Sequence, residues 1–354
     1  MFQDKYVFVQ LTAFLNRTQF NNYVRKYDGN RYVKHFTCWN QLLAMMFGQL
    51  SYRESLRDLI VALEAHRATQ YHLGLGRNTI VKATLAYANQ TRDYRIFEDF
   101  AFYMMKEACK KRETSILNIP GKKYAFDSTT IPLCLATFPW AKFRSKKGGV
   151  KAHVLYGVEA QVPAFYTVTT ASKHDSTAMS SITYEPNRYY IFDRAYDTFK
   201  ELYKIHLTGS YYVVRSKTNL KYKMVKWKRR MPMNVLTDAE VKLTGYLSEK
   251  KYPESFRFIR YYDEEDDCEF TFLTNAKHLS ALDVANLYKK RWLVELFFKW
   301  LKQHLNIKRF WGTTKNAVRI QISVAIITYC LVAIVHHDMQ LKRSTYEVLQ
   351  ILSI

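Results

Sequence analysis

The order of short apolar segments between residues 124 and 215 constrains the fold more than any other feature of the chain. Three β-rich runs come first, and two further apolar runs follow, each preceded by a helical stretch. The predicted strands are Tyr124–Thr130, His153–Glu159, Ala164–Thr170, Tyr189–Phe192 and Tyr211–Arg215, and the predicted helices are Ser176–Ser181 and Asp197–Leu207. This order predicts an α/β fold in which helices pack on a mixed sheet.

Helical patterns flank this region on both sides. Residues 14–113 read as helical, with apolar residues at helical spacing in Asn40–Gln49 and Ser51–Ala65, and the chain is helical again from Asp283. Ile322–Val335 is the longest nearly apolar run, too short to cross a bilayer, and it predicts a buried helix. The first ten residues lack the basic start and apolar stretch of a signal peptide. We therefore expect a cytoplasmic protein without a membrane partner.

The segment Ser216–Lys277 differs from its neighbours. It is basic at first and then strand-like, with predicted strands Lys242–Leu247, Phe256–Tyr262 and Cys268–Thr274. The acidic run Asp263–Asp267 is most simply a solvated turn between two of these strands, and a metal site is the alternative.

The charge balance narrows the choice of partner. The chain has 54 Lys and Arg residues against 31 Asp and Glu residues, a formal net charge of +23. A surface this positive attracts polyanions, so nucleic acid is the leading partner and an anionic membrane the alternative. The five cysteines are scattered and form no CxxC pair, which supports neither a disulfide framework nor a zinc site.

Two stretches are candidates for DNA contacts. A glycine-containing break at His72–Gly76 separates two helical patterns, and Asn78 is a candidate cap for the second. The pair is either a helix-turn-helix or an ordinary helical hairpin; in the first case Arg77, Asn78, Lys82 and Asn89 would face DNA.

The second stretch is Arg215–Arg230, where eight of sixteen residues are Lys or Arg. Aromatic residues interleave with the cations, so stacking on bases and contact with phosphates are both available; the candidates are Tyr222, Trp227, Lys228, Arg229 and Arg230. A partly buried core position is the alternative for Trp227. A further basic patch lies between Lys142 and Lys151, and either DNA contact or a solvated face explains it.

Three carboxylates are candidates for chemistry. Asp127 lies within the first predicted strand and Asp193 directly follows the fourth. A buried carboxylate must be hydrogen-bonded, paired or metal-bound, although an aspartate at the end of a strand is also a common turn or cap residue. Asp175 competes with them, but it stands where a helix should begin, which predicts an N-cap.

The third carboxylate belongs to a spaced set of polar residues. Four of them follow one another at intervals of three, four and seven and would project from one narrow stripe of a helix: Tyr288, Arg291, Glu295 and Lys302. A solvent-facing Arg291–Glu295 pair is one explanation. A site that holds metal and phosphate together is the other, because Mg²⁺ takes oxygen ligands and leaves positions for phosphate.

The spacing Tyr, two residues, Arg, three, Glu, six, Lys resembles the signature of DDE transposases of insertion sequence family 4. The blocks around Asp127 and Asp193 are similar to that family's aspartate blocks, and residues 20–63 resemble a helical domain often fused to these enzymes. The resemblance implies a ribonuclease-H-like mixed sheet flanked by helices, with a β-rich insertion and an all-helical N-terminal DNA-binding domain. The corresponding boundaries are 1–115 for the N-terminal region, 116–354 for the catalytic domain and about 216–280 for the insertion.

The resemblance also implies an activity. Asp127, Asp193 and Glu295 would hold two Mg²⁺ ions, with Mn²⁺ as a substitute, while Tyr288, Arg291 and Lys302 would position phosphates. The expected function is cut-and-paste DNA transposition through a hairpin intermediate. It would act on the inverted repeats of the element and on target DNA, as a homodimer at the bacterial nucleoid. The alternatives are an inactive or truncated end-binding protein and a nuclease with the same core.

Overall fold

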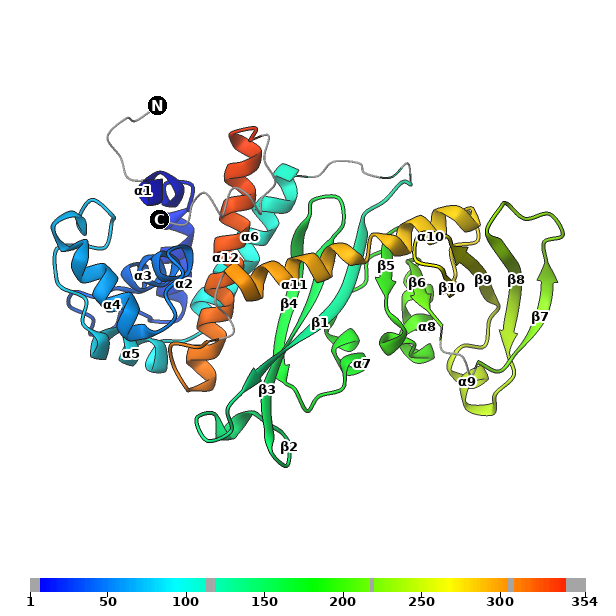
Figure 1. The fold of residues 1–354 in the computed structure, drawn as a ribbon, viewed down its shortest axis with the longest axis horizontal. Helices are drawn as coiled ribbons and strands as arrows, with labels where there is room; N and C mark the ends of the chain where they lie inside the picture. The colour runs from blue at the N-terminus through cyan, green and yellow to red at the C-terminus, as the bar shows by residue number, and fades with distance from the viewer. Residues whose placement is uncertain (1–6, 113–116, 118, 217–219, 305–308, 342–354) are drawn as a thin grey trace.

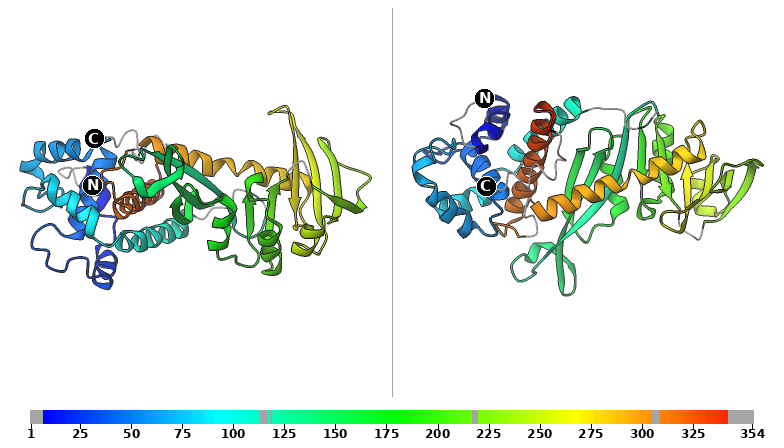
Figure 2. Two further views of the ribbon diagram at one scale, coloured as in Figure 1. Left: turned by 90° about the horizontal axis from the view of Figure 1, so that it is seen from below. Right: turned by 45° about the horizontal axis from the view of Figure 1, so that its top comes forward.

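The structure is a computed structural model and describes residues 7–112, 117, 119–216, 220–304 and 309–341. The molecule is elongated: N-terminal helices lie at one end, a long mixed sheet extends to the other, and helix α11 runs along it (Figure 1, Figure 2). The described strands are β1 (Lys123–Leu133), β2 (Lys142–Arg144), β3 (Lys147–Gly157), β4 (Val162–Thr170), β5 (Tyr189–Phe192), β6 (Tyr211–Arg215), β7 (Tyr222–Trp227), β8 (Val235–Leu243), β9 (Phe256–Asp263) and β10 (Cys268–Thr274).

Five of these strands form the ribonuclease-H-like core that the family resemblance implies. β1 pairs antiparallel with β3, and β3 pairs antiparallel with β4. On its other side β1 runs parallel to β5, which in turn runs parallel to β6. All four residues of β5 are buried, as expected of a parallel strand covered on both faces. The order β4-β3-β1-β5-β6 therefore confirms the predicted mixed sheet.

The β-rich insertion extends this sheet. β10 pairs antiparallel with β6, and β9, β8 and β7 follow outward in that order. The acidic run after Asp263 is the turn between β9 and β10, as predicted. The predicted strand Lys242–Leu247 is wrong, because the strand is β8, whose alternating buried residues Ala239, Val241 and Leu243 come earlier. Gly245 then caps a short helix that begins at Tyr246.

The helices form two groups around the sheet. Those of the N-terminal region are α1 (Val7–Thr12), α2 (Arg17–Lys26), α3 (Cys38–Leu50), α4 (Leu56–Ala65), α5 (Lys82–Thr91) and α6 (Arg95–Arg112). The others are α7 (Asp175–Ala178), α8 (Phe199–Leu207), α9 (Tyr246–Lys251), α10 (Ala281–Lys289), α11 (Trp292–His304) and α12 (Lys315–Asp338). Helix α6 packs on both β4 and α12, and so links the N-terminal region to the sheet.

Helix α12 is the central helix of the molecule and stands between the N-terminal helices and the sheet (Figure 1, Figure 2). Among the described residues it alone is long and apolar enough to cross a membrane, but 94% of its apolar window is buried inside the protein. The prediction of a buried helix over Ile322–Val335 is therefore confirmed. Because α12 packs on α3 and α6 as well as on β4, the hydrophobic core continues across residue 116, and the domain boundary stays a prediction.

Three local predictions fail. The N-cap of α5 is Val81, which has no capping side chain, and not Asn78. Asn89 cannot face DNA, because it is buried and its side-chain oxygen accepts a hydrogen bond from the Gln41 amide at 2.7 Å. The N-cap of α7 is His174, whose ring nitrogen accepts the capping bond, so Asp175 is the first helical residue and its carboxylate is used elsewhere.

The predicted continuous helix through residues 288–302 is also wrong. Helix α10 ends at Lys289 and α11 begins at Trp292. The N–H groups of Arg291, Leu293 and Val294 donate to carbonyls three residues earlier, so the chain tightens at this junction. Tyr288 and Arg291 therefore precede the helix that contains Glu295 and Lys302.

Candidate active site

The two candidate aspartates occupy equivalent places on neighbouring parallel strands. The register of β1 and β5 ends with Phe126 opposite Phe192, and the next residues are Asp127 and Asp193. Adjacent strands lie roughly 4.8 Å apart, so the two backbones leave the ladder side by side. Asp193 precedes a short 3₁₀ turn but makes no capping hydrogen bond with its side chain, which argues against a cap role.

Arg291 joins the first aspartate to the glutamate. Its Nη1 donates to Asp127 Oδ2 at 3.1 Å, and its Nη2 donates to Glu295 Oε1 at 2.5 Å. The Arg291 side chain is 15% exposed, so the guanidinium lies in a largely desolvated position. Its Nε is buried and has no hydrogen-bond partner among the described residues. The predicted Arg291–Glu295 pair thus exists, but it is inside a three-residue cluster instead of on an open helix face.

Tyr288 contacts the second aspartate. Its hydroxyl donates to Asp193 Oδ1 at 3.1 Å, and its ring packs against Phe272 of β10. Burial raises the pKa of the Tyr288 hydroxyl to about 12, so the group stays a donor at neutral pH. Tyr288 therefore links the glutamate-bearing segment to the aspartate at the end of β5.

Burial also dominates the electrostatics of Asp127. It raises the pKa of the Asp127 carboxyl to about 6, and the nearby charges of Glu295 and Asp193 act in the same direction. The backbone N–H of Ser128, which donates to Asp127 at 2.8 Å, and the Arg291 guanidinium oppose this shift without cancelling it. Burial is thus the main reason why the ionised form of Asp127 is unfavourable here.

No group of three or more His, Cys, Asp or Glu residues within the described part of the chain is already arranged around a metal position. Arg291 lies between two of the candidate ligands. Beside Asp193 there is a cavity of about 490 Å³, also lined by Arg194, Arg215 and residues of β10. Lys302 lies two turns beyond Glu295 on α11 and is half-buried.

Comparison with known proteins decides the family. Residues 120–331, more than half of the chain, match the family model described as Transposase DDE domain. The chain belongs to the transposase DDE domain family. The matched range of this DDE chain contains Asp127, Asp193 and Glu295. Residues 3–76 match a second model, described as Domain of unknown function (DUF4372). The narrower assignment to insertion sequence family 4 stays a prediction.

Named relatives agree with this family. The chain is 30% identical over 224 residues to a protein named as a probable transposase for insertion sequence element IS5377, from Geobacillus stearothermophilus. The aligned residues make up 63% of this chain and 59% of the relative. It is 35% identical over 214 residues, 59% of each chain, to a protein named as transposase y4zB from Sinorhizobium fredii. It is 25% identical over 271 residues, 73% of each chain, to a protein named as a transposase for element IS4SA from Synechocystis. The DDE chain spans less than two thirds of the length of the first two relatives.

A solved structure of a piggyBac transposase synaptic complex with hairpin DNA aligns with 97% of this chain and 78% of its own. Its TM-score of 0.49 and sequence identity of 9% are too low to support an argument.

Sequence reasoning missed a polar network next to Asp127 in this DDE chain. The Ser128 hydroxyl donates to Asp175 Oδ1 at 2.6 Å, and Lys151 Nζ lies 2.9 Å from the same oxygen. His153, fully buried, has its Nδ1 3.9 Å from Asp175, and burial lowers the pKa of this ring to about 4. The position of Asp175 at the expected start of a helix indicates a cap, and nothing in the local sequence connects this residue to Ser128.

The predicted DNA contacts of the insertion divide into two groups. Trp227 is 65% exposed on β7, so the core alternative is wrong, and Arg229 and Arg230 are exposed beside it. Tyr222 instead packs on Phe258, at 4.8 Å between ring centroids. Lys228 pairs with the buried Asp238 at 2.9 Å. Part of the basic stretch, residues 217–219, lies outside the described residues.

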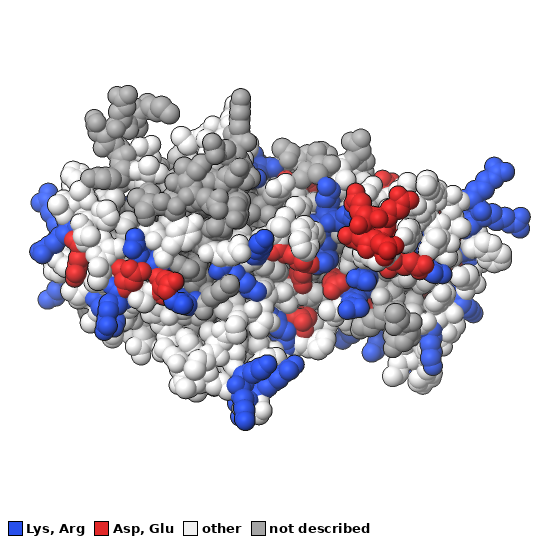
Figure 3. All heavy atoms as spheres, in the orientation of Figure 1, with Lys and Arg blue, Asp and Glu red and all other residues white. Residues whose placement is uncertain are grey.

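The basic side chains gather at two projecting parts of the DDE domain. Figure 3 shows lysine and arginine side chains at the tip of the β2–β3 hairpin and at the end of the molecule formed by β7. The first group lies in the range of the predicted patch Lys142–Lys151, but Lys151 itself is farther along β3 and pairs with Asp175. In the N-terminal region, the three predicted contacts Arg77, Asn78 and Lys82 are all exposed, and the Arg77 guanidinium lies over the Tyr71 ring.

Proposed function

We propose that this chain is the DNA transposase of an insertion sequence and that Asp127, Asp193 and Glu295 are its catalytic carboxylates. It would bind the ends of its element, cut them in a metal-dependent reaction and join them to target DNA, through a hairpin intermediate. The observation that carries the proposal is the single cluster in which Arg291 holds Asp127 and Glu295 while Asp193 lies beside Asp127 in the register of the sheet. Family membership and the net charge of +23 support the same assignment.

The residues present fit a divalent cation. Arg291 pairs with two of the three carboxylates, Asp127 and Glu295. Burial raises the pKa of Asp127 to about 6, and the nearby charges of Glu295 and Asp193 act in the same direction. An all-oxygen donor set from separate elements suits Mg²⁺, which leaves coordination positions to phosphate oxygens. Two ions bound by these carboxylates would activate the attacking hydroxyl and stabilise the leaving oxygen.

Arg291 and Tyr288 would orient the scissile phosphate. The Arg291 guanidinium, which now donates to Asp127 and Glu295, would offer charge-assisted N–H groups to a phosphate oxygen. The Tyr288 hydroxyl, which now donates to Asp193, would be a neutral donor on the other side of the cluster. Lys302 would contact a phosphate farther along the same helix. Water would first be the attacking group, and the freed 3′ hydroxyl of the DNA would attack next. Both attacks need the phosphate held in line with the incoming oxygen.

The partners of this activity would be double-stranded DNA and a second copy of the chain. The inverted repeats of the element and the target site would both contact the basic surfaces, and two copies would bring the two ends together in a homodimer. A chain that binds DNA in this way would work at the nucleoid of a bacterial cytoplasm.

The test uses a labelled duplex that contains one end of the element encoding this chain, incubated with the full-length protein and a target plasmid. The proposal predicts cleavage and joining with Mg²⁺ and neither with EDTA, and weaker activity with Mn²⁺ would agree with it. Binding without cleavage would instead establish an end-binding protein. Cleavage without joining would establish a nuclease. Either of these two results contradicts the proposal.

A further inference from the structure

The polar network beside Asp127 takes no part in the function proposed above. Its centre is Asp175, whose Oδ1 accepts a hydrogen bond from the Ser128 hydroxyl at 2.6 Å and lies 2.9 Å from Lys151 Nζ. Lys151 also donates to the Lys173 carbonyl at 3.2 Å, and its side chain is only 12% exposed, so the ion pair is a fixed part of the fold. Asp175 therefore ties the first residue of α7 to two strands, β1 and β3.

The network is attached to β1 where this strand loses one of its neighbours. The parallel ladder of β1 with β5 ends at Phe126, whereas the antiparallel ladder of β1 with β3 continues to Leu133. Among the described strands, therefore, only β3 pairs with β1 at Asp127 and Ser128. Fewer backbone hydrogen bonds mean lower local stability. The hydrogen bond from Ser128 to Asp175 supplies a restraint from outside the sheet at this point.

Ser128 acts directly on the Asp127 carboxylate. Its backbone N–H donates to Asp127 Oδ1 at 2.8 Å, while Arg291 donates to Oδ2. Successive side chains of a strand point to opposite faces of the sheet, so Asp127 meets Arg291 on one face and Ser128 meets Asp175 on the other. The Asp127 carboxylate is thus held directly from one face and, through Ser128, from the other.

Helix α7 also reaches the second aspartate. It contacts the 3₁₀ turn Arg194–Tyr196, which directly follows Asp193. The Tyr196 ring packs edge-on against Phe126, the residue before Asp127, at 5.2 Å between ring centroids. The tether between α7 and β1 therefore restrains both strand segments that carry the candidate metal ligands.

We propose that Asp175 is a positioning residue of the metal site. Through the Ser128 hydroxyl it fixes the backbone N–H that orients the Asp127 carboxylate. Lys151 fixes Asp175 in turn and offsets its charge, so Asp175 would act through geometry and not as a further negative charge. The assignment of Asp127 as a metal ligand rests on the proposed function. Groups that orient a ligand in this way typically contribute a factor of about 10 to 100 to metal affinity or activity.

The test measures Mn²⁺ binding by the full-length protein on a duplex that already ends at the terminus of the element, so that no end cleavage is involved. Electron paramagnetic resonance of free Mn²⁺ gives the dissociation constant. The variants are Ser128→Ala, Asp175→Ala, the double variant and Asp175→Asn. Both partners of Asp175 use Oδ1, so asparagine keeps an acceptor for the Ser128 hydroxyl and removes the charge. The matched control is Glu107→Ala, which removes a carboxylate that pairs with Lys110 on α6.

Ser128→Ala and Asp175→Ala should each weaken Mn²⁺ binding by about 10-fold or more. The double variant should bind no more weakly than the weaker single variant, because both substitutions remove the same hydrogen bond. Asp175→Asn should bind Mn²⁺ more tightly than Asp175→Ala, and the Glu107→Ala control should bind it like the wild type.

Wild-type Mn²⁺ affinity in Ser128→Ala, even with a lower melting temperature, would overturn the inference and make the tether purely structural. An equal loss in Asp175→Asn and Asp175→Ala would assign the effect to charge and overturn it as well. If Asp175→Ala does not fold, Ser128→Ala and Asp175→Asn still decide the question. A wild type that binds no Mn²⁺ would overturn the proposed function, whereas unchanged binding by Ser128→Ala beside a wild type that binds Mn²⁺ would overturn this inference alone.

Discussion

Asp127→Asn should stabilise the metal-free protein at pH 8. The pKa of Asp127 rises from its ordinary value of 3.8 to about 6 in the folded protein, chiefly through burial. A raised carboxyl pKa means that the folded state prefers the protonated form. Its contribution to the free energy of unfolding is therefore most favourable below about pH 4 and is lost as the pH rises through 6. A neutral asparagine does not have this pH-dependent cost.

The size of the effect follows from the two pKa values. Their difference corresponds to about 3 kcal/mol at pH 8 and to about 1.6 kcal/mol at pH 5. The Asp127 side chain is only 20% exposed, so solvent screening reduces this figure little. For a chain of 354 residues, 3 kcal/mol corresponds to a melting-temperature increase of about 4 °C.

The measurement is thermal unfolding of the wild type and Asp127→Asn in EDTA at pH 5 and at pH 8. Comparing the two proteins at each pH removes the titration of all other groups. The variant should melt higher at both, and its advantage should roughly double at the higher pH. A variant that melts below the wild type at pH 8, or an advantage that does not change with pH, would refute the argument that Asp127 is a carboxylate buried without sufficient counter-charge.

Three further substitutions separate structural from functional roles. Arg291→Ala leaves Asp127 and Glu295 without their shared cation, so we expect a lower melting temperature and a decrease in end cleavage of about 10²-fold; Arg291→Lys should not restore cleavage, and normal cleavage by either variant would exclude the phosphate role. Tyr288→Phe should cost about 1 kcal/mol of stability for one lost hydrogen bond and slow cleavage while DNA affinity stays constant; unchanged cleavage would leave Tyr288 a packing residue. Trp227→Ala, at an exposed position, should change stability by less than about 0.5 kcal/mol and weaken DNA binding, and equal affinity for wild type and variant would remove Trp227 from the interface.

Much of the sheet could be predicted because its signals are local. The strands β5 and β6 have the bounds expected from short apolar runs, since a strand buried on both faces is apolar throughout. The similar positions of Asp127 and Asp193 could also be predicted, because Asp127 lies inside one such run and Asp193 directly follows another. The position of β8 was misread because its buried Asp238 breaks the apolar alternation. That aspartate is tolerated because Arg257 donates to both of its carboxylate oxygens.

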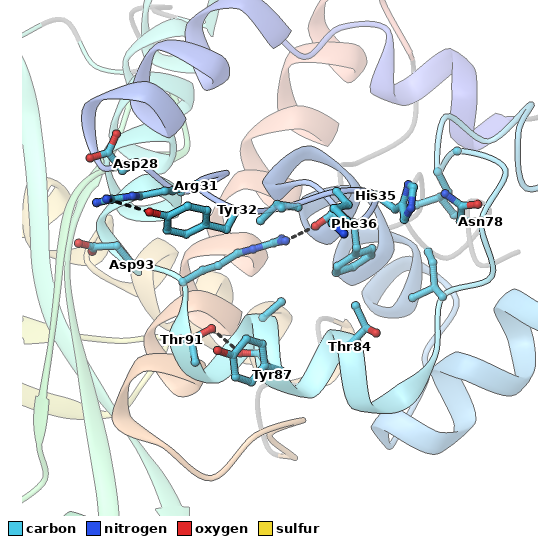
Figure 4. A pocket seen from close by; sticks show the side chains of 18 of the residues that line it. Asp28, Arg31, Tyr32, His35, Phe36, Asn78, Thr84, Tyr87, Thr91 and Asp93 are labelled. Carbon is cyan, nitrogen blue, oxygen red and sulfur yellow. Dashed lines mark hydrogen bonds between the residues drawn. The ribbon is translucent and has the colours of Figure 1, made fainter.

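Contacts between distant segments could not be predicted. Helical periodicity predicts Tyr288, Arg291 and Glu295 on one helix, but the chain forms a tight turn between α10 and α11. At this turn Tyr288 donates to Asp193 and Arg291 donates to Asp127. The cavity between residues 27–36 and 75–93 (Figure 4) likewise depends on contacts between distant segments. Nothing in the local sequence marks Arg92 as buried, and only the structure shows that its guanidinium donates to Gln41.

The most direct test of the central claim is magnesium-dependent cleavage of the element end by three single variants, Asp127→Asn, Asp193→Asn and Glu295→Gln. The matched control is Glu265→Gln, an exposed carboxylate that pairs with Lys289 on the turn between β9 and β10. Each of the three variants should bind the duplex with nearly wild-type affinity and cleave no more than the EDTA sample, whereas the control should cleave like the wild type. Cleavage at the wild-type rate by any one of the three would contradict the assignment of that carboxylate to the active site.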